Sequence, residues 1–432
     1  MMNSLKELLA SLDEAQRIKV SKAQFDIYNE NLEPHVKGYL SRFYSKRTIE
    51  DVPLLTCVNL ARRIVDTEAS IYRKAPRRSF NGLSEVQAEA MLKLYDSLFV
   101  NDVMAEANRY FKLQGITHLF VKEDEQGLRV LPLKAHQLHV TIDPLDASVA
   151  RSYIMRYGEG WIEYAPSYIR TYDKDGEVTQ NLIATDEPFT LPIIPIKKPF
   201  SDSYWPQGGL SVTDFTIQFN ALLSDVANIV RMQGFAQAYL KGPRNLLPEN
   251  LKIGPNSILL LPVDPNNPVD TEFGFANPSP DLAGSLEFLR STLSAFLTSR
   301  GLNPKAINTQ GVSSEYASGM DRLLAMIDRF EASESDFSVF KKAEENLFYV
   351  LLEKASNLGI VTGAISNEAR MVIEFQKPDS VMTEHDKLEL IMKEKEAGLI
   401  TDAEAIMRYR GVGEQEARRI LDEVLRGLPD AR

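Results

Sequence analysis

The sequence holds a single cysteine, Cys57, among its 432 residues. One thiol excludes an internal disulfide framework and any cysteine-based zinc cluster, and it suits a reducing compartment. No run of about 18 apolar residues occurs, so no membrane-spanning helix is predicted. The first residues, MMNSLKELLASLDEAQ, predict a polar amphipathic helix and not a signal peptide.

Histidine is also scarce, and the chain carries no recognisable catalytic motif. Of five histidines, only His136 and His139 lie close in sequence. On a strand, a spacing of three places them on opposite faces, so we expect two ordinary strand histidines and no metal site. The segment GVGEQEA resembles a dinucleotide turn, but it follows a predicted helix instead of a strand, so we expect no cofactor. A solvated face, not a catalytic cluster, is expected for the C-terminal acids Glu394, Glu396, Asp402 and Glu404.

Positive charge is in short supply. The 49 lysines and arginines stand against 60 acidic residues, which gives a net charge of −11 at pH 7. A protein that binds duplex DNA tightly neutralises phosphates with basic side chains. This chain therefore either does not contact nucleic acid or contacts it without binding tightly. Apolar residues make up 44% and charged residues 25%, as in ordinary folded proteins. The length allows two or three domains.

The spacing of apolar residues divides the first half of the chain into helices and then strands. Residues 1–113 predict helices, and Gly115 is expected to stop the last one. From residue 116 the period changes to two, which predicts two strands about a turn at residues 125–127. Later runs, with a hairpin at Asp175-Gly176, are expected to continue the same sheet. The proline-rich FTLPIIPIKKPF predicts extended chain.

Two amphipathic helices are predicted around a proline-rich insert. The first covers residues 212–240 and begins at Ser211, with Asp214 completing the cap. Residues 243–280 contain recurring prolines around one predicted strand, SILLLPV. The second helix, residues 281–300, can be capped by Ser279 or Asp281, and Gly301 is expected to end it.

The last third of the chain predicts a long helix, a strand and a helical end. The helix covers residues 318–358, and the serines at 333–335 could interrupt it. The segment ARMVIEFQKPDSVM predicts a late strand that completes the earlier sheet. Near the C-terminus, Thr401 and Glu404 form a capping-box pattern, and Gly411 and Gly413 are expected to separate the last two helices.

Four local segments stand out by their order along the chain. They are NLARRIVDTEASIYRKAP, then YFKLQGITHLFVKEDEQGLRVLPLKAHQLHVTIDP, then FTLPIIPIKKPF with FNALLSDVANIVRMQGFAQAYLKG, and last KEAGLITDAEAIMRYRGVGEQEARRILDEV. In this order they resemble the portal protein of tailed bacteriophages, the head-to-tail connector ring at one capsid vertex. The resemblance covers nearly the whole chain, and it rests on order and on these segments, not on a diagnostic motif.

The resemblance implies an α+β, mainly helical fold with long helices and a small mixed β-sheet. It also implies the family's division into wing, stem, clip and crown. The wing would take residues 1–207, the first stem helix 208–241, the clip 242–280, the second stem helix 281–302, a tunnel loop 303–317, a long wing helix with the returning strand 318–382, and the crown 383–432.

The function implied by the resemblance is structural and not enzymatic. Twelve copies would form a ring in the virion, assembled in the host cytoplasm, through which double-stranded DNA is packaged and ejected. Further partners implied are the terminase, a head–tail adaptor, and major capsid or scaffold proteins, with no membrane. Such a ring would carry roughly −130 charges from twelve chains, and an acidic channel repels phosphates, so DNA would slide and not be captured.

The resemblance also implies which residues would meet the DNA. Uncharged polar side chains of the tunnel loop suit weak, reversible contact: Asn308, Thr309, Gln310, Ser313 and Ser314. Three basic residues on or just after the second stem helix could offset the negative lining locally: Arg290, Arg300 and Lys305. These three could instead face a neighbouring subunit or water.

Two other functions remain open. The first is an enzyme built on scattered carboxylates, such as a nuclease or transferase, against which stand the few histidines, the single cysteine and the missing phosphate loop. The second is another ring-forming head–tail adaptor, although adaptors are usually shorter and lack two long helices around a proline-rich insert. The mass of the native particle separates these alternatives.

Overall fold

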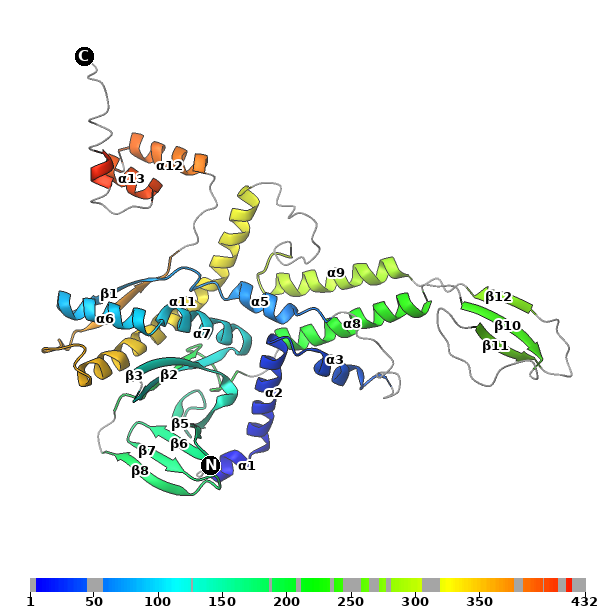
Figure 1. Ribbon diagram of the computed structural model, residues 1–432, viewed down its shortest axis with the longest axis horizontal. Helices are drawn as coiled ribbons and strands as arrows, with labels where there is room; N and C mark the ends of the chain where they lie inside the picture. The colour runs from blue at the N-terminus through cyan, green and yellow to red at the C-terminus, as the bar shows by residue number, and fades with distance from the viewer. Residues whose placement is uncertain are drawn as a thin grey trace, which may run out of the picture. The chain divides into compact units, whose positions relative to one another are not determined.

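The structure is a computed structural model, and its elements are labelled in Figure 1. The residues that it describes are 5–44, 57–125, 127–185, 189–206, 211–233, 237–243, 258–263, 272–276, 281–304, 319–376, 384–398, 400–410 and 417–421. The chain divides into two compact units. The first comprises Met1–Ile307 with Glu331–Gln376, and the second comprises Asn308–Phe330 with Lys377–Arg432.

The N-terminal part of the first unit is helical for most of its described length. Its helices are α1 (Leu5–Ala10), α2 (Leu12–Tyr28), α3 (Glu33–Leu40), α5 (Leu60–Glu68), α6 (Glu85–Ser97) and α7 (Val100–Gln114). A reciprocal cap begins α6, since the Gln87 N–H donates to Ser84 Oγ and the Ser84 N–H donates to Gln87 Oε1. Gly115 ends α7 with φ of 75°, a backbone angle that glycine adopts without strain, so the predicted stop is confirmed.

One strand, which was not predicted from the sequence, lies between these helices in the chain. β1 (Arg77–Asn81) pairs antiparallel with the late strand β13 (Arg370–Glu374), and Phe80 lies opposite Met371. The prediction that the late strand completes the earlier sheet is therefore wrong. Phe80, Met371 and Ile373 are buried in the largest core cluster, so burial of these alternate side chains fixes the pairing and its register.

The strands between residues 116 and 197 form two sheets, where the sequence predicts one. In the first, β2 (Ile116–Asp124) lies between β3 (Gly127–Leu133) and β9 (Ile193–Lys197), so both of its edges are occupied. The 3-10 turn η1 (Ala135–Gln137) then leads into a separate antiparallel meander. Its strands, in spatial order, are β4 (Leu138–Ile142), β5 (Ala150–Tyr157), β6 (Gly160–Ala165), β7 (Tyr168–Tyr172) and β8 (Val178–Ala184).

The predicted hairpin positions are confirmed. Asp124 at the end of β2 pairs with Gly127 at the start of β3, on either side of the predicted turn, and the turn at Asp175-Gly176 joins β7 and β8. Gly176 has φ of 80°, and its N–H donates to the Asp173 carbonyl, as a tight turn requires. FTLPIIPIKKPF is extended as predicted and supplies β9.

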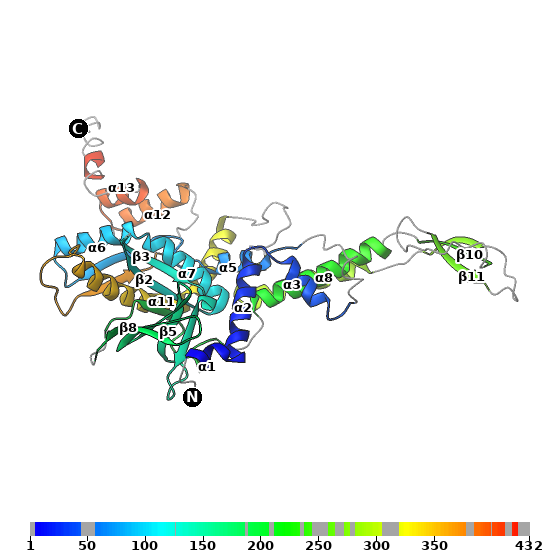
Figure 2. The same cartoon turned by 60° about the horizontal axis from the view of Figure 1, so that its bottom comes forward.

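Two amphipathic helices, α8 (Val212–Gln233) and α9 (Leu282–Ser299), lie side by side in both views (Figures 1 and 2). Between them in sequence, β10 (Gln237–Pro243) runs parallel to β11 (Ile258–Val263) and antiparallel to β12 (Glu272–Ala276). The strand predicted from SILLLPV is thus confirmed as β11. The prediction of one helix over 212–240 is wrong at its end, because 237–240 pair as strand with both neighbours and give the apolar β11 its partner.

The longest helix is α11 (Gly319–Asn357), which runs without the interruption considered at residues 333–335. Ser333 Oγ lies 2.7 Å from Ser70 Oγ, so its polar group is satisfied outside the helix backbone. Asp336, one turn on, is buried and forms an ion pair with Lys112, with Nζ–Oδ2 at 2.5 Å. Tertiary partners for these polar side chains explain why the helix continues through a stretch of low intrinsic propensity.

The described part of the second unit contains α12 (Glu384–Glu396) and α13 (Asp402–Arg410), which pack together. The predicted cap is confirmed: the Glu404 N–H donates to Thr401 Oγ1, and the Thr401 N–H donates to Glu404 Oε2. Of the predicted solvated acids, Glu396, Asp402 and Glu404 are exposed, and the half-buried Glu394 accepts from Arg408 at 2.5 Å. Gly411 and Gly413 lie outside the described residues.

The predicted fold class is confirmed in its coarse form, because helices and small sheets are mixed in the chain. The single small sheet is wrong: strands of the described segments form separate sheets of two, three, three and five strands. The sheet of β10, β11 and β12 is the mixed one, with one parallel and one antiparallel pair. The boundaries of wing, stem, clip and crown stay predictions.

Candidate functional site

The helix pair α8–α9 is joined at its base by aromatic packing. Phe215 of α8 and Phe296 of α9 stack with ring centroids 3.7 Å apart and an interplanar angle of 1°. They belong to a core cluster that also holds Phe219, Leu289 and Leu297. Stacked rings and this shared core fix the two helices against each other and against α5 and α2.

Both helices begin where the sequence predicts. The Asp214 N–H donates to Ser211 Oγ at 3.0 Å, and Ser211 Oγ donates to the Asp214 carboxylate at 2.6 Å. Asp281 is the cap of α9, since its Oδ1 accepts from the Gly284 N–H at 2.8 Å. Gly301, with φ of 70°, follows the last turn of α9. Side-chain acceptors at these positions satisfy N–H groups that helix starts leave unpaired.

A pair of hydrogen bonds between the Asn220 side chain of α8 and the Val58 backbone was not predicted from the sequence. The Val58 N–H donates to Asn220 Oδ1 at 2.7 Å, and Asn220 Nδ2 donates to the Val58 carbonyl at 2.9 Å. Asn220 is fully buried. Its amide satisfies the backbone N–H and carbonyl of Val58, just before α5, as the backbone of a paired strand would. The sequence shows polar residues at helical spacing on one face of α8, but it does not show that they are buried: Thr213, Thr216, Asn220 and Ser224.

The three predicted basic residues differ in their surroundings. Arg300, which follows α9, forms a bidentate ion pair with Glu68 of α5, with Nε–Oε1 at 2.6 Å and Nη2–Oε2 at 2.9 Å. Its charge is therefore neutralised within one copy. Arg290 is exposed on α9. Lys305 lies outside the described residues, as do all five predicted tunnel-loop residues: Asn308, Thr309, Gln310, Ser313 and Ser314.

The end of the helix pair away from this base is more loosely packed. A cavity of about 410 Å³ opens between α8 and α9, lined by Leu222, Asp225, Val226, Ile229, Asp281, Gly284, Ser285, Phe288 and Leu289. Phe288 is 59% exposed, and Leu286 and Val230 are also exposed. Several large apolar side chains at one end of a helix pair make a surface that another protein chain can cover.

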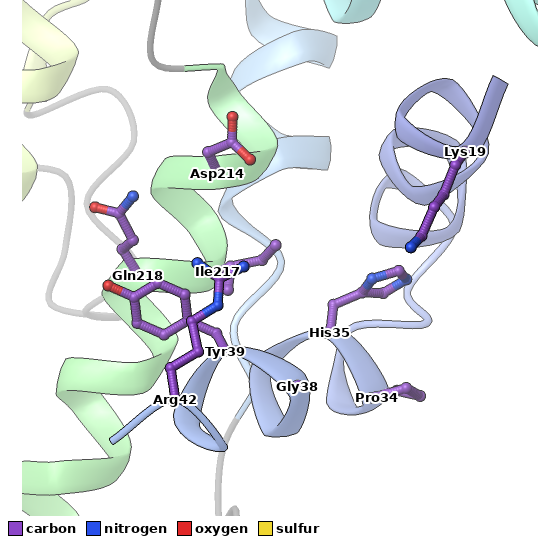
Figure 3. A pocket seen from close by; sticks show the side chains of 9 residues that line it. All are labelled: Lys19, Pro34, His35, Gly38, Tyr39, Arg42, Asp214, Ile217 and Gln218. Atoms are coloured by element: carbon purple, nitrogen blue, oxygen red, sulfur yellow. The ribbon is translucent and has the colours of Figure 1, made fainter. Parts of the chain in front are cut away.

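A second groove lies nearer the start of α8, between α2, α3 and α8 (Figure 3). Its volume is about 660 Å³, and it is lined by Lys19, Pro34, His35, Gly38, Tyr39, Arg42, Asp214, Ile217 and Gln218. Lys19 reaches toward His35, and Arg42 lies over the Tyr39 ring at 5.5 Å. Lys19 and Arg42 against the single carboxylate of Asp214 give this groove a net positive charge, unlike the chain as a whole.

The histidines take part in packing. His139 Nδ1 lies 2.5 Å from Glu14 Oε1, whereas His136, in η1, lies 3.2 Å from Ser21 Oγ. His118 is fully buried, and its Nε2 lies 2.5 Å from the Tyr204 hydroxyl. Burial, with the nearby charges of Arg17 and Lys197, lowers the pKa of His118 to about 3. No group of three or more potential metal-binding side chains occurs among the residues described.

Arg17 connects α2 to the start of the five-stranded sheet. Its guanidinium forms a bidentate ion pair with Glu14 and donates to the carbonyls of Ala135 and Leu138 at 2.8 Å. Burial alone would raise the pKa of Glu14, but hydrogen bonds from Arg17 and His139 outweigh it and lower that pKa to about 2. The helical and β parts of the first unit are thus held together by a partly buried charged network.

The described helices include none that is long and apolar enough to cross a membrane. No family model matches the chain, and no curated protein matches it significantly. Among solved structures, the chain is similar to the neck of an empty GTA particle computed with C6 symmetry, at 13% identity and a TM-score of 0.42. That match covers 81% of this chain and 89% of the other.

The chain is also similar to an HK97 family phage portal protein from Corynebacterium diphtheriae. The identity is 9%, the TM-score is 0.34, and the match covers 78% of this chain and 98% of the other. A similarity to a phage portal protein, which the sequence resemblance predicts, is thus found again among the solved structures.

Proposed function

We propose that this chain is the subunit of a portal ring, a structural protein that conducts double-stranded DNA at one vertex of a virus-like capsid. The observation that carries this proposal is the helix pair α8–α9. The pair is fixed at one end by Phe215 and Phe296, and it is open and apolar at the other. In the chain, the small sheet of β10, β11 and β12 follows α8 and precedes α9.

A helix pair of this kind is suited to ring assembly. A cyclic ring of more than two copies needs two different, complementary faces on each subunit. The α8–α9 pair offers an apolar cavity toward its free end and, nearer its base, the groove beside α3 that carries Lys19 and Arg42. The two faces differ in shape and in charge, as a head-to-tail contact requires.

The charge balance fits a conduit better than a DNA clamp. A chain of net charge −11 lacks the basic excess that tight phosphate binding needs. In a ring, Arg300 would add little positive charge to the channel because Glu68 neutralises it, while Arg290 remains exposed and available. Reversible contact with passing DNA is assigned to the loop residues Asn308, Thr309, Gln310, Ser313 and Ser314, and to Lys305.

The remaining parts of the proposal follow the order of the chain. The sheet of β10–β12 is assigned to the clip, which would meet the terminase during packaging and a head–tail adaptor afterwards. Residues 383–432 are assigned to the crown on the capsid side, and residues 1–207, α11 and β13 to the wing near the major capsid or scaffold proteins. Such a particle belongs to the virion and is assembled in the host cytoplasm.

Native mass tests the proposal. If twelve copies assemble, the 48.6 kDa chain gives a particle of roughly 580 kDa with an opening visible by negative-stain microscopy. Purified protein should be examined by native mass spectrometry over a range of concentration and salt. A stable monomer or dimer under all of these conditions would contradict the ring and favour the enzyme alternative.

A further inference from the structure

The segment that contains α5 and leads into β1 is basic, although the chain as a whole is acidic. Residues 57–84 hold six lysines and arginines and only two acidic residues, against a net charge of −11 for the chain. Both acids are already paired with cations from elsewhere in the first unit. Asp66 lies 3.7 Å from Arg109 of α7, and Glu68 forms the bidentate pair with Arg300.

Part of the remaining positive charge is balanced by acids of other elements. Each of these cations has a carboxylate near it because the fold brings a distant segment alongside. The pairs are Arg62 with Glu30 at 2.6 Å, Arg78 with the buried Glu344 at 2.6 Å, and Arg77, which lies opposite Glu374 in the β1–β13 register.

Two arginines of the segment, Arg63 and Arg73, form no ion pair with a carboxylate among the described residues, and both are exposed. Arg73 Nη2 donates to the Asp66 carbonyl at 3.2 Å, which places its guanidinium at the last turn of α5, one turn after Arg63. Partial burial and the nearby charge of Arg63 lower the pKa of Arg73, despite the opposing effect of Asp66. The two cations are therefore close enough to repel each other.

Tertiary contacts hold the backbone around Arg73 in place. Ser70 Oγ lies 2.7 Å from Ser333 Oγ of α11, and the Arg73 N–H donates to the Ser70 carbonyl at 3.3 Å. Ile71 and Tyr72, directly before Arg73, are buried in the largest core cluster. Two like charges on such a fixed scaffold are stabilised when an anion binds between them, and little further ordering of the backbone is needed.

The chemistry of this arginine pair suits phosphate. A guanidinium presents a planar fork of N–H donors that matches two oxygens of one phosphate group. Duplex DNA carries one negative charge per about 1.7 Å of its axis, so a single contact brings anions to both arginines. A lone acidic side chain would neutralise one arginine and leave the other.

We propose that Arg63 and Arg73 form a contact for the phosphate backbone of duplex DNA at the end of α5. The choice of DNA as the ligand rests on the function proposed above, whereas the site follows from the two arginines without a carboxylate partner. Two phosphate contacts on a chain of net charge −11 give a weak, reversible contact. The contact lies far in sequence from the loop residues and adds a position in the first unit to them.

Binding of a short fluorescent DNA duplex, followed by anisotropy from about 50 to 200 mM salt, tests the site. Arg63→Gln should weaken binding about threefold and lower the slope of log affinity against log salt by about one, because one phosphate contact is lost. The double variant Arg63→Gln/Arg73→Gln should lower the slope by about two. Arg151→Gln/Arg156→Gln removes the same charge from exposed positions of β5 and should leave the slope nearly unchanged.

Arg63→Gln carries the test alone if circular dichroism shows that the double variant does not fold. The Arg63 side chain forms no hydrogen bond among the described residues, whereas Arg73 also binds the Asp66 carbonyl. Arg63→Lys keeps the charge and removes the fork, so it should retain most of the salt slope while binding more weakly than the wild type.

Polyglutamate distinguishes a nucleic acid site from a site for an acidic protein segment. Unlabelled duplex should displace the labelled duplex at a lower concentration of negative charge than polyglutamate does. Equal or better displacement by polyglutamate would assign the arginines to an acidic protein segment and overturn the proposal. Arginine variants that bind the duplex as the β5 control does would overturn it as well.

The outcomes for this site and for the ring are separate, because duplex binding is measured on the folded chain whatever its assembly. A ring-forming chain in which Arg63→Gln leaves affinity and salt slope unchanged overturns only this inference. A chain that binds the duplex through these arginines but never assembles overturns the proposed function and supports the site.

Discussion

Arg78 and Glu344, 266 residues apart, form a bidentate ion pair, with Nη2–Oε1 at 2.6 Å and Nε–Oε2 at 3.0 Å. Glu344 is fully buried on α11, and it also accepts from the Tyr72 hydroxyl at 3.1 Å. Arg78 donates in addition to Asn101 at 2.7 Å. The pair joins β1 to α11, and the hydrogen bonds with Tyr72 and Asn101 support it, as a buried charge requires.

Removal of the carboxylate should therefore be costly. Glu344→Ala leaves the buried Arg78 charge without its partner, and we expect the free energy of unfolding to fall by about 3–5 kcal/mol. Urea unfolding followed by circular dichroism measures this. Lys354→Ala, which breaks the more exposed Lys354–Glu123 pair at 2.8 Å, is the control and should cost no more than about 1 kcal/mol. Equal losses in both variants would contradict the role of burial.

The two ends of the α8–α9 pair should respond differently to a negative charge. Phe219→Asp puts a carboxylate into the core cluster at the base and should block folding. Phe288→Asp changes an exposed side chain at the open end, so the single copy should fold normally but fail to assemble. Circular dichroism and native mass spectrometry distinguish these results. A fully assembled ring from Phe219→Asp would mean that the packed face of α8 is wrongly assigned.

Stability should fall in acid, and the sign follows from three lowered pKa values. His118 and His136 have pKa values of about 3 and about 4, below their ordinary 6.5, mainly because of burial. The unfolded chain therefore binds these protons first, so the free energy of unfolding should fall as pH drops from about 6.5 toward 3. Glu14, with its pKa lowered to about 2, adds stability above pH 4.5 that is lost toward pH 2.

Thermal unfolding between pH 8 and pH 3 measures this dependence. His118→Phe removes one titrating group and should flatten the profile below pH 6.5, even if the absolute stability changes. A profile that His118→Phe does not alter would show that another group governs the acid response.

The predicted tunnel loop can be tested apart from assembly. Deletion of residues 306–314 removes the uncharged polar side chains assigned to DNA contact. We expect the ring to form with its usual mass, and DNA packaging or retention in assembled particles to be impaired. Normal packaging by the deletion variant would remove the role assigned to the loop.

Local signals in the sequence correctly predicted the helix caps. Ser211, Asp281 and Thr401 cap helices as predicted, because capping depends on residues within one turn. The partners of the strands could not be predicted in this way. The pairing of β1 with β13 depends on Phe80 and Met371, which lie 291 positions apart, and no local pattern encodes such a contact.

The end of α8 shows the same limit at shorter range. Residues 237–240 continue an apolar pattern that suits a helix, yet they pair with β11 on one side and β12 on the other and form a central strand. The hydrogen bonds between Asn220 and Val58 were also not predicted, since in the sequence an asparagine that becomes buried looks the same as one on the helix surface. Tertiary partners overrode local preference in both cases.

The chain connections of β10–β12 have a mechanical consequence. This small sheet is linked to the remainder of the polypeptide only through α8 on one side and α9 on the other. Any force applied to it must travel along these two helices to the stacked rings of Phe215 and Phe296, and on through Arg300 and Glu68 to α5. The contacts that attach α8 and α9 to the rest of the unit therefore set how much force on the small sheet the fold can withstand before it unfolds.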